Sequence, residues 1–133
     1  MNGYEEVVKQ AFLALENAYA PYSHFYVGAC VETFDHQFFK GCNVENASYG
    51  LTNCAERNAV FAAYSNGYRK DDIKALAIVS NSYRITTPCG ACRQVLWELL
   101  NNDTPIILSN KKEERVTTIH ELLPDSFDSE DLK

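Results

Sequence analysis

The sequence predicts an α/β fold, in which helices cover both faces of a five-stranded mixed sheet to give a three-layer α/β/α architecture. Three observations lead to this prediction. Segments with helical periodicity alternate with short apolar runs typical of strands. The connection between the last two runs is too short for a parallel crossover, so the last two strands should be antiparallel. The length of 133 residues, with 46% hydrophobic residues, suits a single domain over 1–133.

The first half of the chain is expected to hold a helix and a hairpin. Apolar side chains recur every three or four positions over 4–19, and Pro21 should end that helix. Strand-forming residues follow over 25–33 and 38–43, and the polar residues between them suit a short turn. The sheet should therefore open with an antiparallel pair.

The second half alternates helices with strands. The expected elements are a loop over 43–52, a helix over 54–65, a buried strand over 73–79, a helix over 89–100 and strands over 105–108 and 116–119. The strand-helix-strand-helix-strand order predicts a parallel portion with right-handed crossovers. The acidic residues 126–133 are expected to form a solvated tail.

Composition excludes several classes of protein. Twelve Lys and Arg against eighteen Asp and Glu give a net charge of −6, which argues against a nucleic-acid partner. The sequence shows neither a signal peptide nor an apolar run of about 18 residues, so we expect a cytoplasmic protein without a membrane partner. Five cysteines are an odd number, which excludes a complete disulfide framework and favours thiol or metal chemistry.

Three of the cysteines have the spacing of a metal site. Cys89 and Cys92 share one expected helical turn, and Cys54 stands at the start of another helix. Helix N-termini favour the thiolate over the thiol. Tetrahedral zinc held by three protein ligands keeps a fourth position open for water, which is typical of catalysis.

Glu56 lies two residues after Cys54 and suits a base beside that metal. A zinc ligand, one residue and a glutamate, followed later by Pro-Cys-x-x-Cys, form the signature of zinc nucleobase deaminases, including a three-cysteine version. The chain matches this signature at Cys54-Ala55-Glu56 and Pro88-Cys89-Gly90-Ala91-Cys92.

Nearly the whole chain resembles the small homotetrameric, zinc-dependent cytidine deaminases. The stretches that carry the resemblance are 21–29, 41–49, Cys54-Ala55-Glu56-Arg57 and 88–94. The resemblance implies hydrolytic deamination of cytidine and 2′-deoxycytidine, with release of ammonia, in pyrimidine salvage. It also implies one Zn²⁺ per subunit on Cys54, Cys89 and Cys92.

The resemblance assigns roles to the residues next to the metal. Glu56 would deprotonate the attacking water and then protonate the ring nitrogen and the departing amine. Arg57 would donate hydrogen bonds to the ligand sulfurs and offset the negative charge of three thiolates around the ion. The backbone N–H of Ala55 would meet the pyrimidine carbonyl.

Other residues would bind the rest of the nucleoside. By the same resemblance, Asn43 and Glu45 hold the ribose hydroxyls and Phe25 packs against the nucleoside. Phe127 would stack over the pyrimidine in a neighbouring subunit, and Tyr49 lies in a loop that also meets subunit boundaries. The expected assembly is a homotetramer with sites at the subunit boundaries.

Each of these residues also has a plainer interpretation. Cys42 could complete a structural zinc site as a fourth ligand, although it is better read, like Cys30, as a small buried residue. Asn43 alone would usually be a turn cap and Glu45 a solvated charge. Arg93 has equal claims to a contact near the metal and to a surface ion pair.

Three rival functions remain open, and a cysteine-nucleophile hydrolase is disfavoured. A deaminase of a nucleoside-like antibiotic such as blasticidin S shares the zinc motifs. A nucleotide or polynucleotide deaminase would need cations for the phosphate. A cysteine-nucleophile hydrolase would need a histidine base, and no motif links His24, His36 or His120 to a cysteine. A zinc-stabilised binding module would produce no ammonia.

Overall fold

The computed structural model describes residues 3–132, which form one five-stranded sheet of order β2-β1-β3-β4-β5. The strands are β1 (Val27–Thr33), β2 (Phe38–Cys42), β3 (Ile73–Ser80), β4 (Ile106–Ser109) and β5 (Glu114–Thr117). The α-helices are α1 (Glu5–Leu15), α2 (Ala55–Ser65), α3 (Gly90–Leu99) and α4 (Ile119–Leu122). Short 3₁₀ turns cover Tyr49–Leu51 (η1), Lys70–Asp72 (η2) and Ser129–Leu132 (η3).

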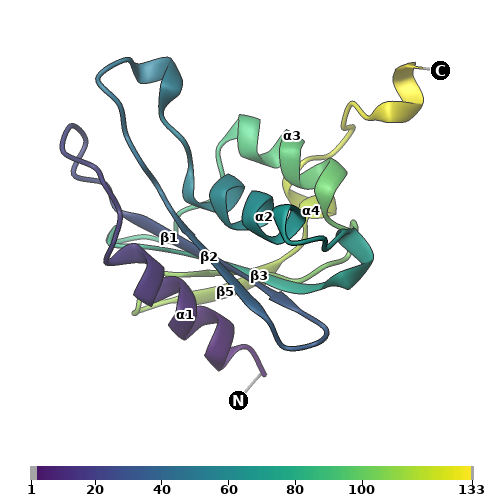
Figure 1. Ribbon diagram of the computed structural model, residues 1–133, viewed down its shortest axis with the longest axis horizontal. Helices are drawn as coiled ribbons and strands as arrows, with labels where there is room; N and C mark the ends of the chain where they lie inside the picture. Colours follow the sequence, from purple (N-terminus) through teal and green to yellow (C-terminus); the bar gives the residue numbers. More distant parts are fainter. Residues whose placement is uncertain (1–2, 133) are drawn as a thin grey trace.

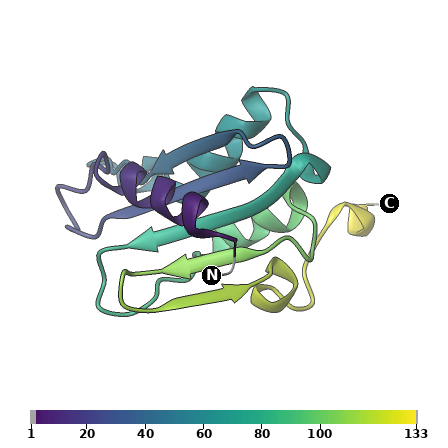
Figure 2. The same ribbon diagram turned by 90° about the horizontal axis from the view of Figure 1, so that it is seen from below.

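Helices cover both faces of the sheet, which confirms the predicted three layers. Figures 1 and 2 show α1 on one face and α2 with α3 on the other. The α2/α3 face closes over a large apolar cluster that includes Val31, Leu76, Ile78 and Leu96. The α1 face closes over a smaller one that includes Val7, Cys30 and other small side chains. The sheet therefore has no face left open to solvent along its central strands.

The strands run in the predicted directions, but their order in the sheet reduces the parallel pairing that was expected. β1 pairs antiparallel with both β2 and β3, β3 pairs parallel with β4, and β4 pairs antiparallel with β5. The expected parallel portion is thus reduced to one pair. The reason is that β1 occupies the place beside β3, so the connection through α2 passes over β1 before the chain returns to the sheet.

The first helix is shorter than predicted, because it ends at Leu15 and the chain then pairs elsewhere. The Tyr19 amide donates to the Asn43 carbonyl at 2.9 Å, and the Glu45 amide donates to the Tyr19 carbonyl at 2.8 Å. These bonds hold residues 20–25 beside the chain that follows β2. Helix α4 and the three 3₁₀ turns were not predicted, and η3 lies within the expected acidic tail.

Glycines set how closely two helices approach the sheet. A Cβ on Gly41 would lie 2.4 Å from the Ala59 amide nitrogen, and one on Gly28 would lie 2.2 Å from the Ala11 carbonyl oxygen. Backbone atoms cannot come that close to a side chain, so β2 requires glycine beneath α2 and β1 requires it beneath α1.

None of the helices within residues 3–132 combines the length and hydropathy that crossing a membrane requires.

Candidate active site and metal centre

Three sulfur atoms meet where α2 and α3 begin. Cys54 is the N-cap of α2, Cys89 is the N-cap of α3, and Cys92 lies in the first turn of α3. Both helices start at the same end of the molecule (Figure 1). The three Sγ atoms lie within 4.8 Å of one another, and the Sγ atoms of Cys54 and Cys89 are 3.8 Å apart. The sequence therefore folds the predicted three cysteines into one cluster.

This cluster has the chemistry and spacing of a zinc site. Tetrahedral zinc with sulfur ligands at about 2.3 Å places neighbouring sulfurs about 3.8 Å apart, which is the separation of the Cys54 and Cys89 sulfurs. Across residues 3–132, no other group of three Cys, His, Asp or Glu side chains converges in this way. Cys42 is not part of the cluster, so the fourth position has no cysteine from this chain.

Charge on the sulfurs is stabilised by their neighbours. A hydrogen bond with Cys92 lowers the pKa of Cys54 to about 5, and the Arg57 guanidinium adds to the effect. The same contact with Cys54 raises the pKa of Cys92. Arg57 Nη2 donates to Cys54 Sγ at 3.3 Å, so the contact expected between Arg57 and the ligand sulfurs is present at Cys54. A cation at this position favours thiolates over thiols.

Glu56 is held beside the sulfurs in a site from which water is largely excluded. Its side chain belongs to the first turn of α2 and the residue is only 4% exposed. Burial raises the pKa of Glu56 to about 7. A carboxyl group with such a pKa can accept and return a proton at neutral pH, which general acid-base catalysis requires.

A cavity of about 250 Å³ opens above this carboxyl group. Cys54 and Cys89 line it, together with six residues that were predicted to belong to the site. These six are Phe25, Asn43, Glu45, Tyr49, Ala55 and Glu56. Residues from four separate stretches of the chain thus meet in one pocket large enough for a small heterocyclic ligand.

Asn43 and Glu45 reach the cavity but also hold its wall. Asn43 Nδ2 donates to the Phe25 carbonyl at 2.8 Å, and Asn43 Oδ1 accepts from the Val27 amide at 3.0 Å. The Glu45 carboxylate accepts from the Ser23 hydroxyl and from the Tyr22 and Ser23 amides. Neither residue is simply a turn cap or a solvated charge, because both fix the segment that carries Phe25.

Several cavity residues were missed from the sequence. Ser23 lies within a stretch that carried the family resemblance, and Thr86 and Thr87 directly precede Pro88-Cys89. Their positions next to motif residues were the available signal. Asn58 was also missed, and its Nδ2 donates to the Cys42 carbonyl at 2.8 Å, which ties α2 to the end of β2.

Phe127 is the one predicted substrate contact that lies outside the cavity of its own chain. Its ring is among the exposed large side chains, with the residue 56% exposed, and its carbonyl accepts from Gln94 Nε2 at 2.7 Å. The three histidines also lie apart from the sulfur cluster. His120, for example, stacks on Trp97 at a centroid distance of 6.2 Å.

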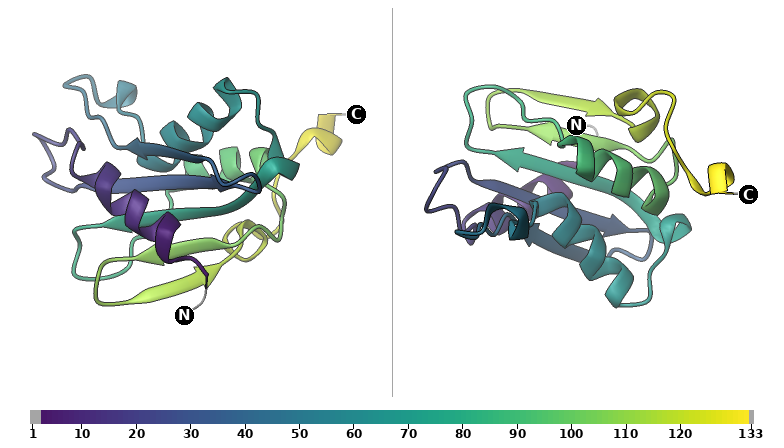
Figure 3. Two further views of the ribbon diagram at one scale, coloured as in Figure 1. Left: turned by 60° about the horizontal axis from the view of Figure 1, so that its bottom comes forward. Right: turned by 90° about the horizontal axis from the view of Figure 1, so that it is seen from above.

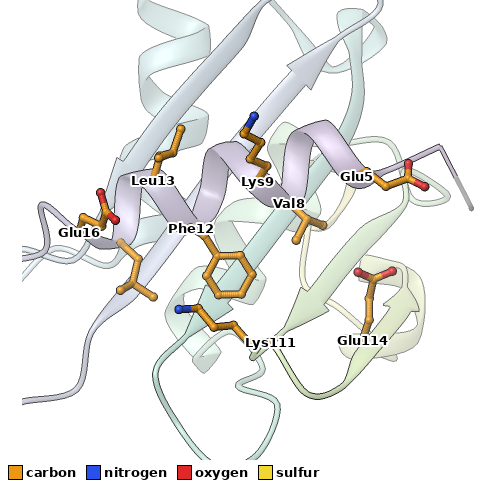
Figure 4. Close-up of a pocket in the computed structure, with 9 residues that line it drawn as sticks. Glu5, Val8, Lys9, Phe12, Leu13, Glu16, Lys111 and Glu114 are labelled. Carbon is orange, nitrogen blue, oxygen red and sulfur yellow. The ribbon is translucent and has the colours of Figure 1, made fainter.

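A second hollow, of about 530 Å³, lies on the opposite face of the sheet. Figure 4 shows it between α1 and the β4-β5 hairpin, with Phe12 and Lys111 at its centre. The Lys111 ammonium lies 5.6 Å from the centroid of the Phe12 ring. This hollow is larger than the cavity over Glu56, but it contains no metal-ligand cluster.

Comparisons with known proteins agree with this geometry. Residues 1–107 match the model of the cytidine and deoxycytidylate deaminase zinc-binding region. A cytidine deaminase of Halalkalibacterium halodurans is 50% identical over 127 residues, which is 95% of each chain. Another, of Sporosarcina psychrophila, is 46% identical over 129 residues, covering 96% of this chain and 93% of the relative.

Solved structures show the same architecture. The crystal structure of cytidine deaminase from Burkholderia pseudomallei superposes with a TM-score of 0.90 at 48% sequence identity, covering 96% of this chain and all of the other. The sulfur cluster, the buried glutamate and the cavity thus occur in a fold shared with these enzymes. The chain belongs to the family of zinc-binding cytidine and deoxycytidylate deaminases.

Proposed function

We propose that this chain deaminates cytidine and 2′-deoxycytidine by hydrolysis, giving uridine or 2′-deoxyuridine and ammonia. The observation that carries the proposal is the buried Glu56 carboxyl group between a three-cysteine cluster and a nucleoside-sized cavity. We assign the reaction to pyrimidine salvage and the whole activity to one domain over residues 1–133.

The three-cysteine cluster would hold the Lewis acid for the reaction. A zinc ion held by Cys54, Cys89 and Cys92 would lower the pKa of water toward about 7 and polarise the reacting centre. Arg57 keeps the sulfur ligands charged through its contact with Cys54. Three thiolates carry more negative charge than the ion carries positive charge, which weakens the ion as a Lewis acid. The Arg57 guanidinium offsets part of that negative charge.

Glu56 moves the protons. Its carboxylate accepts a proton from the attacking water as the new C–O bond forms at the amine-bearing carbon of cytosine. It delivers that proton to the ring nitrogen, then accepts the remaining proton of the same oxygen and passes it to the departing amine as the C–N bond breaks and the carbonyl forms. One water is consumed and one ammonia released, so Glu56 returns to its starting state.

The walls of the cavity bind the nucleoside. Glu45 and Asn43 come from the end of β2 two residues apart, so their side chains can grip the ribose hydroxyls together. Phe25 offers an aromatic surface, and the Ala55 amide lies in the unbonded first turn of α2, where it can donate to the pyrimidine carbonyl. Tyr49 adds an exposed ring at the rim.

We propose that the enzyme works as a homotetramer. Phe127 and Tyr49 are 56% and 88% exposed, and such rings are typical anchors between subunits. Phe127 would stack over the pyrimidine held by a neighbouring subunit.

The five cysteines, all of which lie in the described part of the chain, are unpaired, and this supports a reducing, cytoplasmic location.

The decisive experiment compares the zinc-loaded enzyme with its Glu56→Gln variant. With the wild type, the ultraviolet spectrum of cytidine should change to that of uridine, and one ammonia should be released for each cytidine consumed. The variant should bind cytidine but turn over roughly 10²- to 10⁴-fold more slowly, because it cannot relay protons. Unchanged turnover in the variant would exclude the assigned role of Glu56.

Parallel substrates test the rival activities. Cytidine 5′-monophosphate should react poorly, because Glu45 lines the cavity and, placed beside the sugar as proposed, would repel a phosphate. Blasticidin S should react poorly because the proposed contacts of Asn43 and Glu45 suit the ribose of a nucleoside. Faster turnover of either compound than of cytidine would replace the proposed substrate class. A protein that holds zinc, melts on its removal and releases no ammonia from any of these would be a binding module.

A further inference from the structure

Arg93 immediately follows the metal-site residue Cys92 and bonds the chain on both sides of Cys89. Its Nε donates to the Pro88 carbonyl at 2.8 Å, and its backbone N–H donates to the Cys89 carbonyl at 2.9 Å. These two carbonyls belong to the peptide groups before and after Cys89. The bond to the Cys89 carbonyl is the ordinary i to i−4 bond of α3, which almost any residue here would make. The bond to the Pro88 carbonyl depends on the guanidinium, which therefore fixes the peptide plane that precedes Cys89.

The same guanidinium reaches a second segment. Arg93 Nη1 donates to the Leu122 carbonyl at 2.7 Å, at the C-terminal end of α4. Arg93 forms no ion pair with an acid in the described part of the chain, so the surface-pair interpretation is wrong. Its guanidinium instead donates to two partly buried carbonyl oxygens, those of Pro88 and Leu122. Hydrogen bonds from a charged donor are stronger than those from a neutral one.

The segment that Arg93 reaches continues to Phe127. Figure 3 shows the C-terminal residues passing beside α3 after α4. There Gln94 Nε2 donates to the Phe127 carbonyl at 2.7 Å, and Trp97 Nε1 donates to Asp128 Oδ2 at 3.5 Å. Helix α3 thus holds metal-site residues at its start and the Phe127 segment along its side.

We propose that Arg93 is a positioning residue that sets the placement of Cys89 and of the Phe127 segment together. Through it, the metal site of one subunit and the aromatic ring offered to the neighbouring site share a support. Gln94 acts on the segment alone. The effect proposed for Phe127 rests on the proposed deaminase function and assembly, whereas the effect proposed for Cys89 does not.

The test separates these two parts with variants of neighbouring residues. Arg93→Ala should release zinc to a chromophoric chelator roughly 10- to 100-fold more readily, as is typical when a ligand loses its support. It should also raise the KM for cytidine. Gln94→Ala should raise KM with wild-type zinc release. Glu98→Ala, on the exposed side of α3, should change neither.

Arg93→Lys keeps the charge but lacks the planar fork that reaches two carbonyls, so zinc release should remain faster than in the wild type. Circular dichroism and thermal melting check folding, and Arg93→Lys decides alone if Arg93→Ala does not fold. Zinc release at the wild-type rate in the folded Arg93 variants would overturn the proposal for Cys89.

A further variant tests whether Phe127 is the end point of this link. Phe127→Ala should raise KM about fivefold or more through lost stacking. An unchanged KM would remove Phe127 from the site and overturn the shared support. If the wild-type protein holds zinc but does not convert cytidine, the proposed function is wrong. The chelator test of Cys89 would still be valid in that case, because it does not depend on activity.

Discussion

The two faces of the sheet are built alike but differ in chemistry. On each face a helix packs against a strand glycine, α1 over Gly28 and α2 over Gly41, and an apolar cluster fills the space between. Only the α2/α3 face begins its helices with cysteines. On that face the packing is also fixed by polar contacts, such as the bond from the Tyr64 hydroxyl to the Leu99 carbonyl at 2.7 Å.

The difference shows that the position of helix starts, more than the size of a hollow, makes a reactive site here. The hollow beside α1 is about 530 Å³ against about 250 Å³ over Glu56, yet it lacks convergent ligands. Two helix N-termini that meet bring unbonded amides and positive dipole ends to one place. Thiolates and a developing negative charge are stabilised there and would not be beside the middle of α1.

The largest contrast between the faces should come from their cysteines. Cys89→Ala removes a sulfur from the cluster, so zinc content measured by mass spectrometry should fall and turnover should drop by more than about a hundredfold, the upper cost of losing a mere supporting contact. Cys30 is fully buried under α1, and burial raises its pKa to about 12. Cys30→Ala should keep its zinc and its turnover.

Thiol labelling checks the same contrast without activity. In metal-stripped protein, Cys89 should react quickly because it is exposed, and Cys30 should react only after unfolding. Rapid labelling of Cys30 in folded protein would contradict its burial between α1 and the sheet.

The next largest effect should come from Arg57. Arg57→Ala leaves Cys54 without the 3.3 Å contact to a cation, so zinc affinity should fall roughly 10- to 100-fold or turnover should slow. Lys111→Ala, on the α1 face, removes a cation that rests on Phe12 and serves as the matched control. Equal zinc content and turnover number in wild type and Arg57→Ala would refute the role given to Arg57.

The two glycines provide a smaller and more exacting contrast. Gly41→Ala and Gly28→Ala both force a helix away from the sheet and should each cost about 1–3 kcal/mol of unfolding free energy, measured by denaturant titration. Only Gly41→Ala should also weaken zinc binding, because it displaces the helix that begins after Cys54. Equal zinc affinity in the two variants would show that the site tolerates movement of α2.

The sequence predicted the metal cluster better than it predicted the sheet. The two-residue gap between Cys89 and Cys92 is a local feature, and one helical turn brings their sulfurs together. Cys54 comes from a separate helix 35 residues earlier, and its place in the cluster was predicted from the deaminase signature rather than from local geometry. The insertion of β1 between β2 and β3 depends on pairing between distant strands, for which periodicity gives no signal. The direction of each strand was therefore predictable, whereas the order of the strands in the sheet was not.

The walls of the cavity were predictable only in part for the same reason. Asn43 and Glu45 stood out by resemblance, but their bonds to the segment around Phe25 depend on the early end of α1, which a bridge from Tyr19 to Val44 determines. A helical pattern that runs on to residue 19 conceals that end. Long-range backbone pairing overrode local propensity there.

The smallest expected effect is a pH dependence confined to the cavity wall. The Ser23 hydroxyl, followed by the Ser23 and Tyr22 amides, holds the pKa of Glu45 below its ordinary value of 4.5. Folding therefore favours the charged carboxylate, and the stabilisation is present above pH 4.5 and lost as pH falls through the lower pKa of the folded state. Glu45→Gln removes the titrating group. Its melting temperature should lie below that of the wild type near neutral pH, and the gap should close in acid. Since Glu45 is partly exposed, the gap should be small. A gap for Glu45→Gln that widens in acid would mean that the carboxylate is tolerated in the wall without supporting it.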